Sequence, residues 1–238
     1  MSWFEQVWSR VVPDQVVAVS GASLAIVLVA ALVAVAVAPL WRVLRLGVTL
    51  VHELGHAGVG MLCGRRFTGF VLRGDMSGHA VTVGPARGFG RVCTTWAGYP
   101  APGVVGAVVV WLAVRGWSAP VLTAVLAVLV TAALRVRSAL TALVVAVALL
   151  GAGALWWAGS AQLQAQVVLA LGLVLVVGAW RHLAAVVAVP DRAVSDPAVL
   201  ARLTRVPRVV WNTTFVVVLG WASWLTGSTV LAASGVLG

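Results

Sequence analysis

Long apolar segments without any charged side chain constrain this chain more than any other feature. The longest runs from Ser138 to Trp180 and contains no Asp, Glu, Lys or Arg. Because a membrane-spanning helix needs about 20 apolar residues, this segment is long enough for two helices. We expect the break at residues 159–162, its most polar point.

The composition of the whole chain also indicates a membrane protein. Hydrophobic residues make up 62% of its 238 residues and charged residues only 9%, too few to cover a water-soluble domain. We predict an all-α polytopic membrane protein that forms a single integral membrane domain over residues 1–238. We expect about seven spans, which cover roughly residues 16–38, 41–62, 92–114, 119–134, 138–158, 163–189 and 209–231.

The net charge of +10 is explained by membrane topology. All 16 basic residues are arginines, and they lie in short connections between apolar segments. This distribution predicts a lipid bilayer as the partner and argues against nucleic acid. With seven spans, most arginines fall on one side, which the positive-inside rule assigns to the cytoplasm. We therefore expect a multi-pass cell-membrane protein with its N-terminus inside and its C-terminus outside. The arginine-only, Ala- and Val-rich composition favours a bacterial source.

A polar, glycine-rich connection from Gly64 to Gly90 joins the second and third expected spans. Residues 66–73 and 79–83 alternate in the manner of strands, and the turn-like residues 74–78 separate them. This pattern predicts a small β-hairpin at the cytoplasmic surface, directly after the second span.

The second span contains the motif H-E-x-x-H, formed by His52, Glu53 and His56. On a helix, residues i and i+4 share a face, so both imidazoles can bind one metal ion. Glu53 lies at the edge of that face and can contact a water molecule on the metal. The motif predicts one Zn²⁺ ion, with His52 and His56 as ligands and Glu53 as the catalytic acid and base.

The membrane context strengthens this interpretation. Of the six acidic residues in the chain, only Glu53 lies within an expected span. An ionisable side chain at membrane depth costs several kcal/mol unless it is paired or functional. A polar cluster that only held helices together would not need the spacing of this motif.

A catalytic zinc site uses three protein ligands, so one more residue is needed. Asp196 is favoured because residues 195–200 look like a helix start, which would hold the carboxylate firmly after the sixth span. Asp191 is the second choice. The other candidates near the cytoplasmic face are Asp75, expected in the hairpin turn; His79; and His182, expected at the interface beside Arg181.

At these residues the chain resembles the site-2 protease family of intramembrane zinc metalloproteases, in particular its compact bacterial branch. Residues 52–56 match the metal-binding helix of that family. Residues 96–103 are similar to the Ala- and Gly-rich start of its second core helix. Residues 195–204 are similar to the segment that supplies its acidic ligand.

The resemblance implies three core helices, at about 41–62, 92–114 and 163–189, around a zinc site near the cytoplasm. It also implies a hairpin that binds substrate as an added strand. The implied reaction is hydrolysis of a peptide bond in or beside a transmembrane segment of a membrane-protein substrate.

Two features depart from the family. Pro197 follows Asp196 in place of the usual Leu-Asp-Gly form, and the only Asn is Asn212, outside the second core helix.

Two other functions stay open on sequence grounds. One is a non-catalytic, metal-binding membrane scaffold or regulator, which would not need Glu53 as a base. The other is a transporter that uses the polar cluster as an ion pathway. The transporter is less favoured because the spans contain neither a second intramembrane charge relay nor an obvious repeat.

Overall fold

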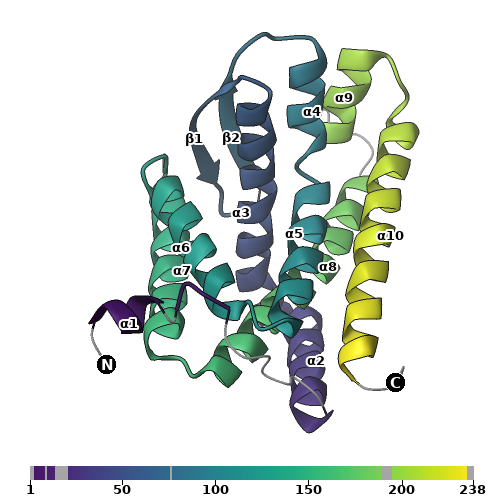
Figure 1. The fold of residues 1–238 in the computed structure, drawn as a ribbon. Helices are drawn as coiled ribbons and strands as arrows, with labels where there is room; N and C mark the ends of the chain where they lie inside the picture. The colour runs from purple at the N-terminus through teal and green to yellow at the C-terminus, as the bar shows by residue number, and fades with distance from the viewer. Residues whose placement is uncertain (1–2, 9, 14–20, 76, 189–194, 235–238) are drawn as a thin grey trace.

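The chain folds into a helical bundle with one two-stranded sheet at its side (Figure 1). The computed structural model describes residues 3–234 except 9, 14–20, 76 and 189–194. The elements in this part of the chain are α1 (Trp3–Trp8), α2 (Gly21–Ala36), α3 (Ala38–Leu62), β1 (Arg66–Leu72), β2 (Gly78–Val83), α4 (Phe89–Trp96), α5 (Pro100–Val114), α6 (Ser118–Ala133), α7 (Ala139–Ala158), α8 (Ala161–Val187), α9 (Asp196–Thr204) and α10 (Arg208–Ala233).

The predicted helical class and the hairpin are confirmed, but seven spans are not. Among the described residues, three helices (α7, α8 and α10) are long and apolar enough to cross a membrane, or up to five spans if each bent helix pair counts as one. The first pair is α2 and α3, which meet at a bend of 94°. Helix α3 is less hydrophobic than α2 because it carries Arg42, Arg45 and the H-E-x-x-H motif.

The expected core helix over residues 92–114 is interrupted in the structure, which divides it into α4 and α5 with a bend of 61°. Helix α4 ends at Trp96, and α5 begins at Pro100. Proline has no backbone N–H and a fixed φ, so it starts a helix readily but interrupts one that arrives from before it. The bend places residues 97–99 beside α3, where they matter for the candidate site below.

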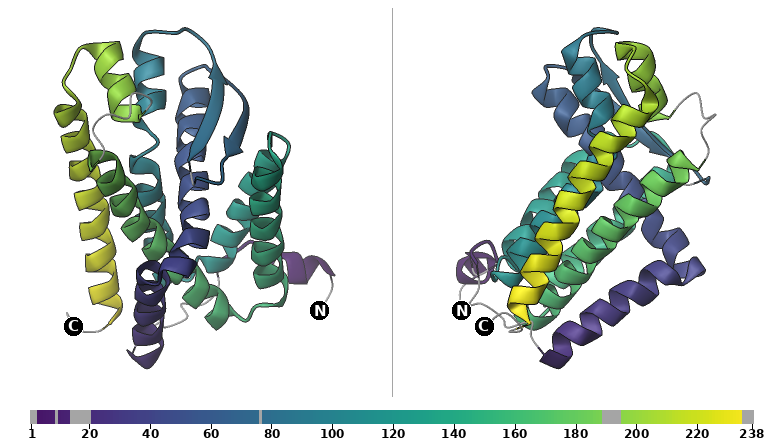
Figure 2. Two further views of the ribbon diagram at one scale, coloured as in Figure 1. Left: turned by 180° about the vertical axis from the view of Figure 1, so that it is seen from behind. Right: turned by 90° about the vertical axis from the view of Figure 1, so that its right-hand side faces the viewer.

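Helices α5, α8 and α10 pack side by side, and α3 lies against α5 and α8 (Figure 2). Glycines bring α5 and α8 into close contact. A Cβ atom added to Gly106 would lie 2.6 Å from the carbonyl oxygen of Gly172. Such small residues allow helix backbones to approach in a membrane, where van der Waals packing replaces the hydrophobic effect.

The hairpin is attached to the bundle along one edge. Strands β1 and β2 pair antiparallel, with Phe70 opposite Ala80. The outer edge of β1 is covered by the connection between α6 and α7. The N–H of Phe70 donates to the carbonyl of Arg135 (3.1 Å), and the N–H of Arg137 donates to the carbonyl of Phe70 (3.2 Å). Among the described strands, β2 pairs with β1 alone, so its far edge carries no neighbouring strand.

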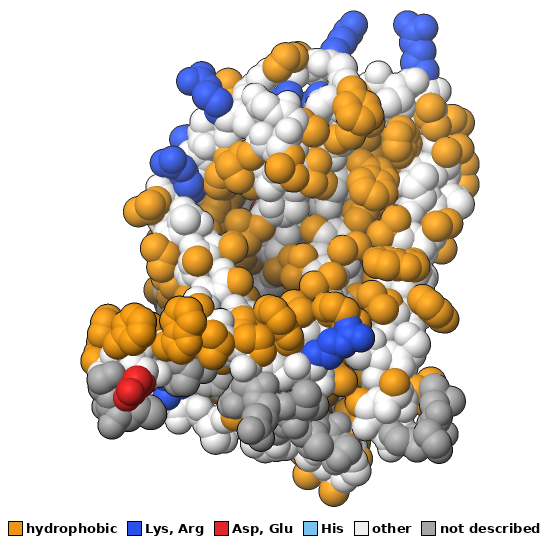
Figure 3. All heavy atoms as spheres, viewed as in Figure 1, with side chains coloured by type: hydrophobic (Ala, Val, Ile, Leu, Met, Phe, Trp, Pro, Cys, Tyr) orange, Lys and Arg blue, Asp and Glu red, His pale blue; other side chains and the backbone are white. Residues whose placement is uncertain are grey.

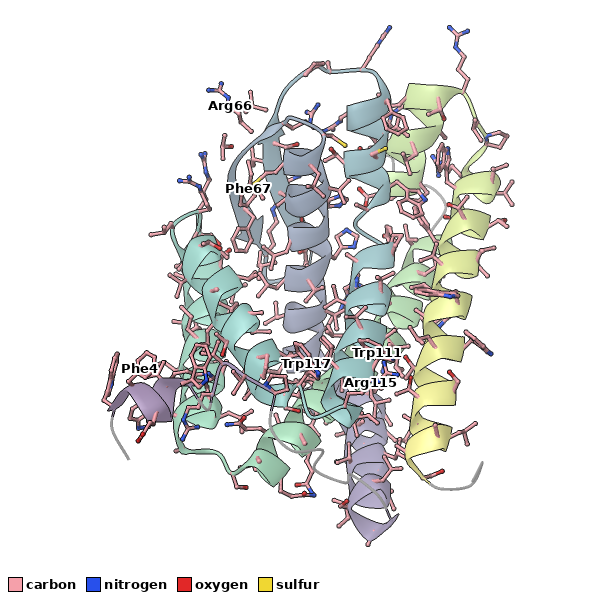
Figure 4. The ribbon with its side chains drawn as sticks, viewed as in Figure 1. Phe4, Arg66, Phe67, Trp111, Arg115 and Trp117 are labelled. Carbon is pink, nitrogen blue, oxygen red and sulfur yellow. The ribbon has the colours of Figure 1, made fainter. Side chains whose placement is uncertain are left out.

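The two ends of the bundle differ in charge. On the face in Figure 3, most arginines lie at the end that carries the hairpin and α4, while apolar side chains cover the middle. At the opposite end of α5, Trp111, Arg115 and Trp117 lie close together (Figure 4), and the Arg115 guanidinium is 3.9 Å from the Trp111 ring centroid. Tryptophans in such a position are typical of a membrane interface.

The described N-terminal residues lie at the end away from the hairpin (Figure 1). Arg10 donates to the carbonyl of Trp156 and lies 5.7 Å from the Trp157 ring, near the end of α7. The start of α7 instead contacts the hairpin, because Thr141 Oγ1 accepts from the Leu72 N–H (2.7 Å). The sequence predicts the N-terminus on the same side as the hairpin, whereas the described start of the chain lies at the other end of the bundle.

The close approach of α5 and α8 predicts that Gly106→Ala lowers the thermal stability of the protein in detergent. The added methyl group meets backbone that cannot rotate away, and such overpacking costs about 1–3 kcal/mol. Gly151→Ala in α7 is the matched control, because a Cβ there meets nothing within 4 Å. Equal melting temperatures for both variants and the wild type would show that the contact does not constrain packing.

Candidate metal centre

Helix α3 presents His52 and His56 on one face, as their i and i+4 spacing predicts. Their rings are edge to face with centroids 4.7 Å apart, and their Nε2 atoms are 3.1 Å apart. Asp196 reaches the same point from α9. Its Oδ2 atom lies 3.2 Å from each of the two Nε2 atoms. Three potential ligand atoms from two distant parts of the chain therefore face one another.

The spacing of these atoms suits one small metal ion. Zinc binds nitrogen and oxygen ligands at about 2.0–2.2 Å in a tetrahedron, which puts two ligand atoms about 3.3–3.5 Å apart. The separations of 3.1, 3.2 and 3.2 Å are close to this value. Two imidazole nitrogens and a carboxylate oxygen also form a ligand set that catalytic zinc sites use. His52, His56 and Asp196 could thus hold a metal ion.

The second ring nitrogen of His56 is fixed by α4. His56 Nδ1 lies 2.7 Å from the carbonyl oxygen of Thr94, so its N–H donates there and the lone pair of Nε2 faces Asp196. Metal-binding histidines commonly use a carbonyl in this way, which sets the tautomer and the ring orientation. Thr94 is buried, and its hydroxyl donates to the carbonyl of Gly90 (2.6 Å). Helix α4 therefore orients a ligand that α3 carries.

Asp196 is the first residue of α9 and is followed by Pro197. A carboxylate in the first turn of a helix is favoured by the helix dipole. Burial opposes its ionisation, but His56 and His52 outweigh burial and hold the pKa of Asp196 well below its usual range. The carboxylate is thus ionised beside the two histidines, as a metal ligand must be.

The Glu53 carboxylate is buried next to this cluster. Its side chain is 3% exposed, and Oε2 accepts no hydrogen bond from any described residue. A Cβ atom added to Gly78 would lie 2.6 Å from Glu53 Cγ, so the first residue of β2 packs directly on Glu53. A buried carboxylate with an unpaired oxygen, between a metal-binding cluster and a strand, is suited to take up a proton.

The other acidic and histidine candidates lie elsewhere. Asp75 occupies the hairpin turn, as predicted, and Oδ1 accepts from the N–H and hydroxyl of Ser77 (3.0 and 2.6 Å). These hydrogen bonds lower the pKa of the exposed Asp75 carboxyl. His79 is exposed on β2, and Asp191 lies outside the described residues. His182, beside Arg181, is half-buried and packs edge to face with His52, at a centroid distance of 6.4 Å.

Sequence reasoning missed two residues of this centre, Thr94 and Gly98. A Cβ atom added to Gly98 would lie less than 3.0 Å from ring atoms of both His52 and His56. The bend between α4 and α5 therefore places bare backbone against the two imidazoles. No local pattern marks either residue, because their roles come from contacts between α3 and the bend.

We predict that Gly98→Ala weakens metal binding, because the methyl group displaces one or both imidazoles. The expected loss is at least tenfold in affinity, typical of a disturbed ligand shell. Gly58→Ala on α3 is the control, since a Cβ there meets nothing within 4 Å. The measurement is the zinc dissociation constant of the purified protein, by competition with a chelator. Wild-type zinc affinity in the Gly98 variant would contradict the close contact.

One comparison with known proteins gives a match. A family model described as Peptidase M50B-like matches residues 25–226, a range that includes His52, Glu53, His56 and Asp196. No curated protein and no solved structure shows significant similarity to the chain.

Proposed function

Because this chain belongs to the Peptidase M50B-like family, we propose that it is a zinc-dependent intramembrane endopeptidase. Its substrate would be a membrane protein, cleaved in or beside a transmembrane segment. The observation that carries this proposal is the convergence of His52, His56 and Asp196 beside the buried carboxylate of Glu53. A metal-binding trio next to an unpaired base is the arrangement that metal-assisted peptide hydrolysis requires.

The proposed roles follow from the chemistry of each side chain. His52, His56 and Asp196 would hold the zinc ion. When bound, the ion supplies Lewis-acid polarisation of the scissile carbonyl and an acidified water molecule. Glu53 takes a proton from the attacking water and delivers it to the leaving amine. Thr94 keeps the His56 ring oriented through its carbonyl.

The hairpin supports the proposed mode of substrate binding. The outer edge of β1 is occupied by the backbone of Arg135 and Arg137, whereas β2 has no second strand among the described residues. An extended peptide can add to such an edge through backbone hydrogen bonds. Because Gly78 of β2 packs on Glu53, a strand added there would run close to the catalytic base. A helical substrate would have to unwind locally to bind in this way.

We propose that the end of the bundle with the hairpin and the metal centre faces the cytoplasm. Arginines gather at this end (Figure 3), and arginine-rich connections stay on the cytoplasmic side. The described start of the chain and the end of α10 then lie toward the opposite side (Figure 1). Peptide-bond hydrolysis would occur near the cytoplasmic face of the cell membrane.

Replacing Glu53 with Gln tests the catalytic role. We expect Glu53→Gln to retain one zinc ion per chain and to lower cleavage by about 10²–10⁴-fold, the usual contribution of a general base. Cleavage would be measured on a library of single-span membrane proteins reconstituted with the enzyme. Asp196→Ala is the companion variant, expected to lose both zinc and cleavage because a ligand is removed.

These two variants also separate the protease from a non-catalytic metal-binding scaffold. A scaffold would keep its function in cells when Glu53 is replaced, and the wild type would cleave no membrane substrate. Absence of zinc from folded wild-type protein, even after addition of the metal, would reject the protease outright.

A further inference from the structure

His182 is a histidine that the proposed reaction does not use, yet it lies against the metal centre. It belongs to α8, near the end of that helix. Its ring packs edge to face with His52 at 6.4 Å and with Trp41 at 6.3 Å between centroids. His182 is half-buried as a whole, but its Nε2 atom is shielded from solvent.

One ring nitrogen of each of these two histidines has no hydrogen-bond partner in the part of the chain that the structure describes. They are His52 Nδ1 and His182 Nε2, and both are buried. Buried polar atoms in folded proteins are nearly always paired, and each exception calls for an explanation. The corresponding nitrogen of His56 does have a hydrogen-bond partner, because His56 Nδ1 donates to the Thr94 carbonyl.

The packing of α3 against α8 explains why these rings meet. Val48 and His52 lie one helical turn apart on α3, and Gly178 and His182 lie one turn apart on α8. A Cβ atom added to Gly178 would lie 2.7 Å from a Val48 methyl group. The glycine therefore lets the helices touch, and the next turn of each places His182 beside His52. Arg181 anchors the same stretch of α8, since its guanidinium lies 4.2 Å from the Trp41 ring.

We propose that His182 is a positioning residue for the metal centre, with its Nε2 as the hydrogen-bond partner of His52 Nδ1. Because the ring centroids are 6.4 Å apart, one bridging water molecule would join the two atoms. His52 then carries its proton on Nδ1 and donates it toward His182, which accepts in its neutral form. The lone pair of His52 Nε2 is left to face Asp196 and the ion.

This inference rests on the proposed metal site and adds to it a role for α8. Each ligand histidine receives an outer partner from a different helix, the Thr94 carbonyl of α4 for His56 and the His182 side chain of α8 for His52. Outer partners of this kind fix ring orientation and raise ligand basicity, and their loss typically weakens metal binding by about 10–100-fold.

The test is the zinc dissociation constant of the full-length protein in detergent, measured by competition with a chromophoric chelator. The variants are His182→Ala, His182→Asn and His182→Gln. The Gln side-chain oxygen falls near the position of Nε2, whereas that of Asn falls near Nδ1. We expect about 10–100-fold weaker binding for Ala and Asn and close to wild-type affinity for Gln. The exposed His79→Ala variant should bind zinc as the wild type does.

A second readout separates positioning from simple packing. The absorption spectrum of the cobalt-substituted protein reports ligand geometry, so it should change for Ala and Asn and be restored by Gln. Melting temperatures of the metal-free variants show whether folding is preserved. Unchanged affinity in all three His182 variants, or equal losses for Gln and Asn, would overturn the inference while the metal site stands. A wild type that binds no zinc would reject the metal site and this inference together.

Discussion

The meeting of Asp196 with His52 and His56 is the contact on which the organisation of this protein depends. It joins α9 to α3 across most of the length of the chain, and it places a charged carboxylate where burial alone would disfavour it. The hairpin, α4 and α8 all surround this point. The bend between α4 and α5 serves the same contact, because it places Gly98 against the two imidazoles, where only a residue without a side chain fits.

Features of the fold that depend on local pattern could be predicted from the sequence. The hairpin, the break between α7 and α8, and the shared face of His52 and His56 all follow from spacing within a few residues. The seven spans were not confirmed, because a bend depends on what packs against it. The sequence around Pro100 contains a helix start, but nothing local indicates that α4 precedes it at an angle of 61°.

The sequence likewise predicts some residues of the candidate site and not others. The two histidines and Glu53 of α3 could be predicted because their motif is contiguous in the sequence. The prediction of Asp196 depends on a helix-start pattern and a family resemblance. The structure brings Asp196 to the histidines, and Asp191 lies outside the described residues. Thr94 could not be predicted, because it acts through a contact between helices distant in sequence. For the same reason the sequence indicates His182 only as a candidate ligand and Gly98 only as part of the segment 96–103. His182 in particular looked like an interfacial residue because its neighbour is Arg181.

The contact between α3 and α9 has a consequence for the stability of the fold. An ion bound by His56 and Asp196 would cross-link two segments separated by the hairpin and by α4 to α8. Such a cross-link removes more chain entropy from the unfolded state the longer the loop it closes. The metal would then stabilise the whole fold and would add to the apolar packing of α9, a helix of nine residues whose buried Leu200 lies in one cluster with Leu183 of α8 and Phe215 of α10.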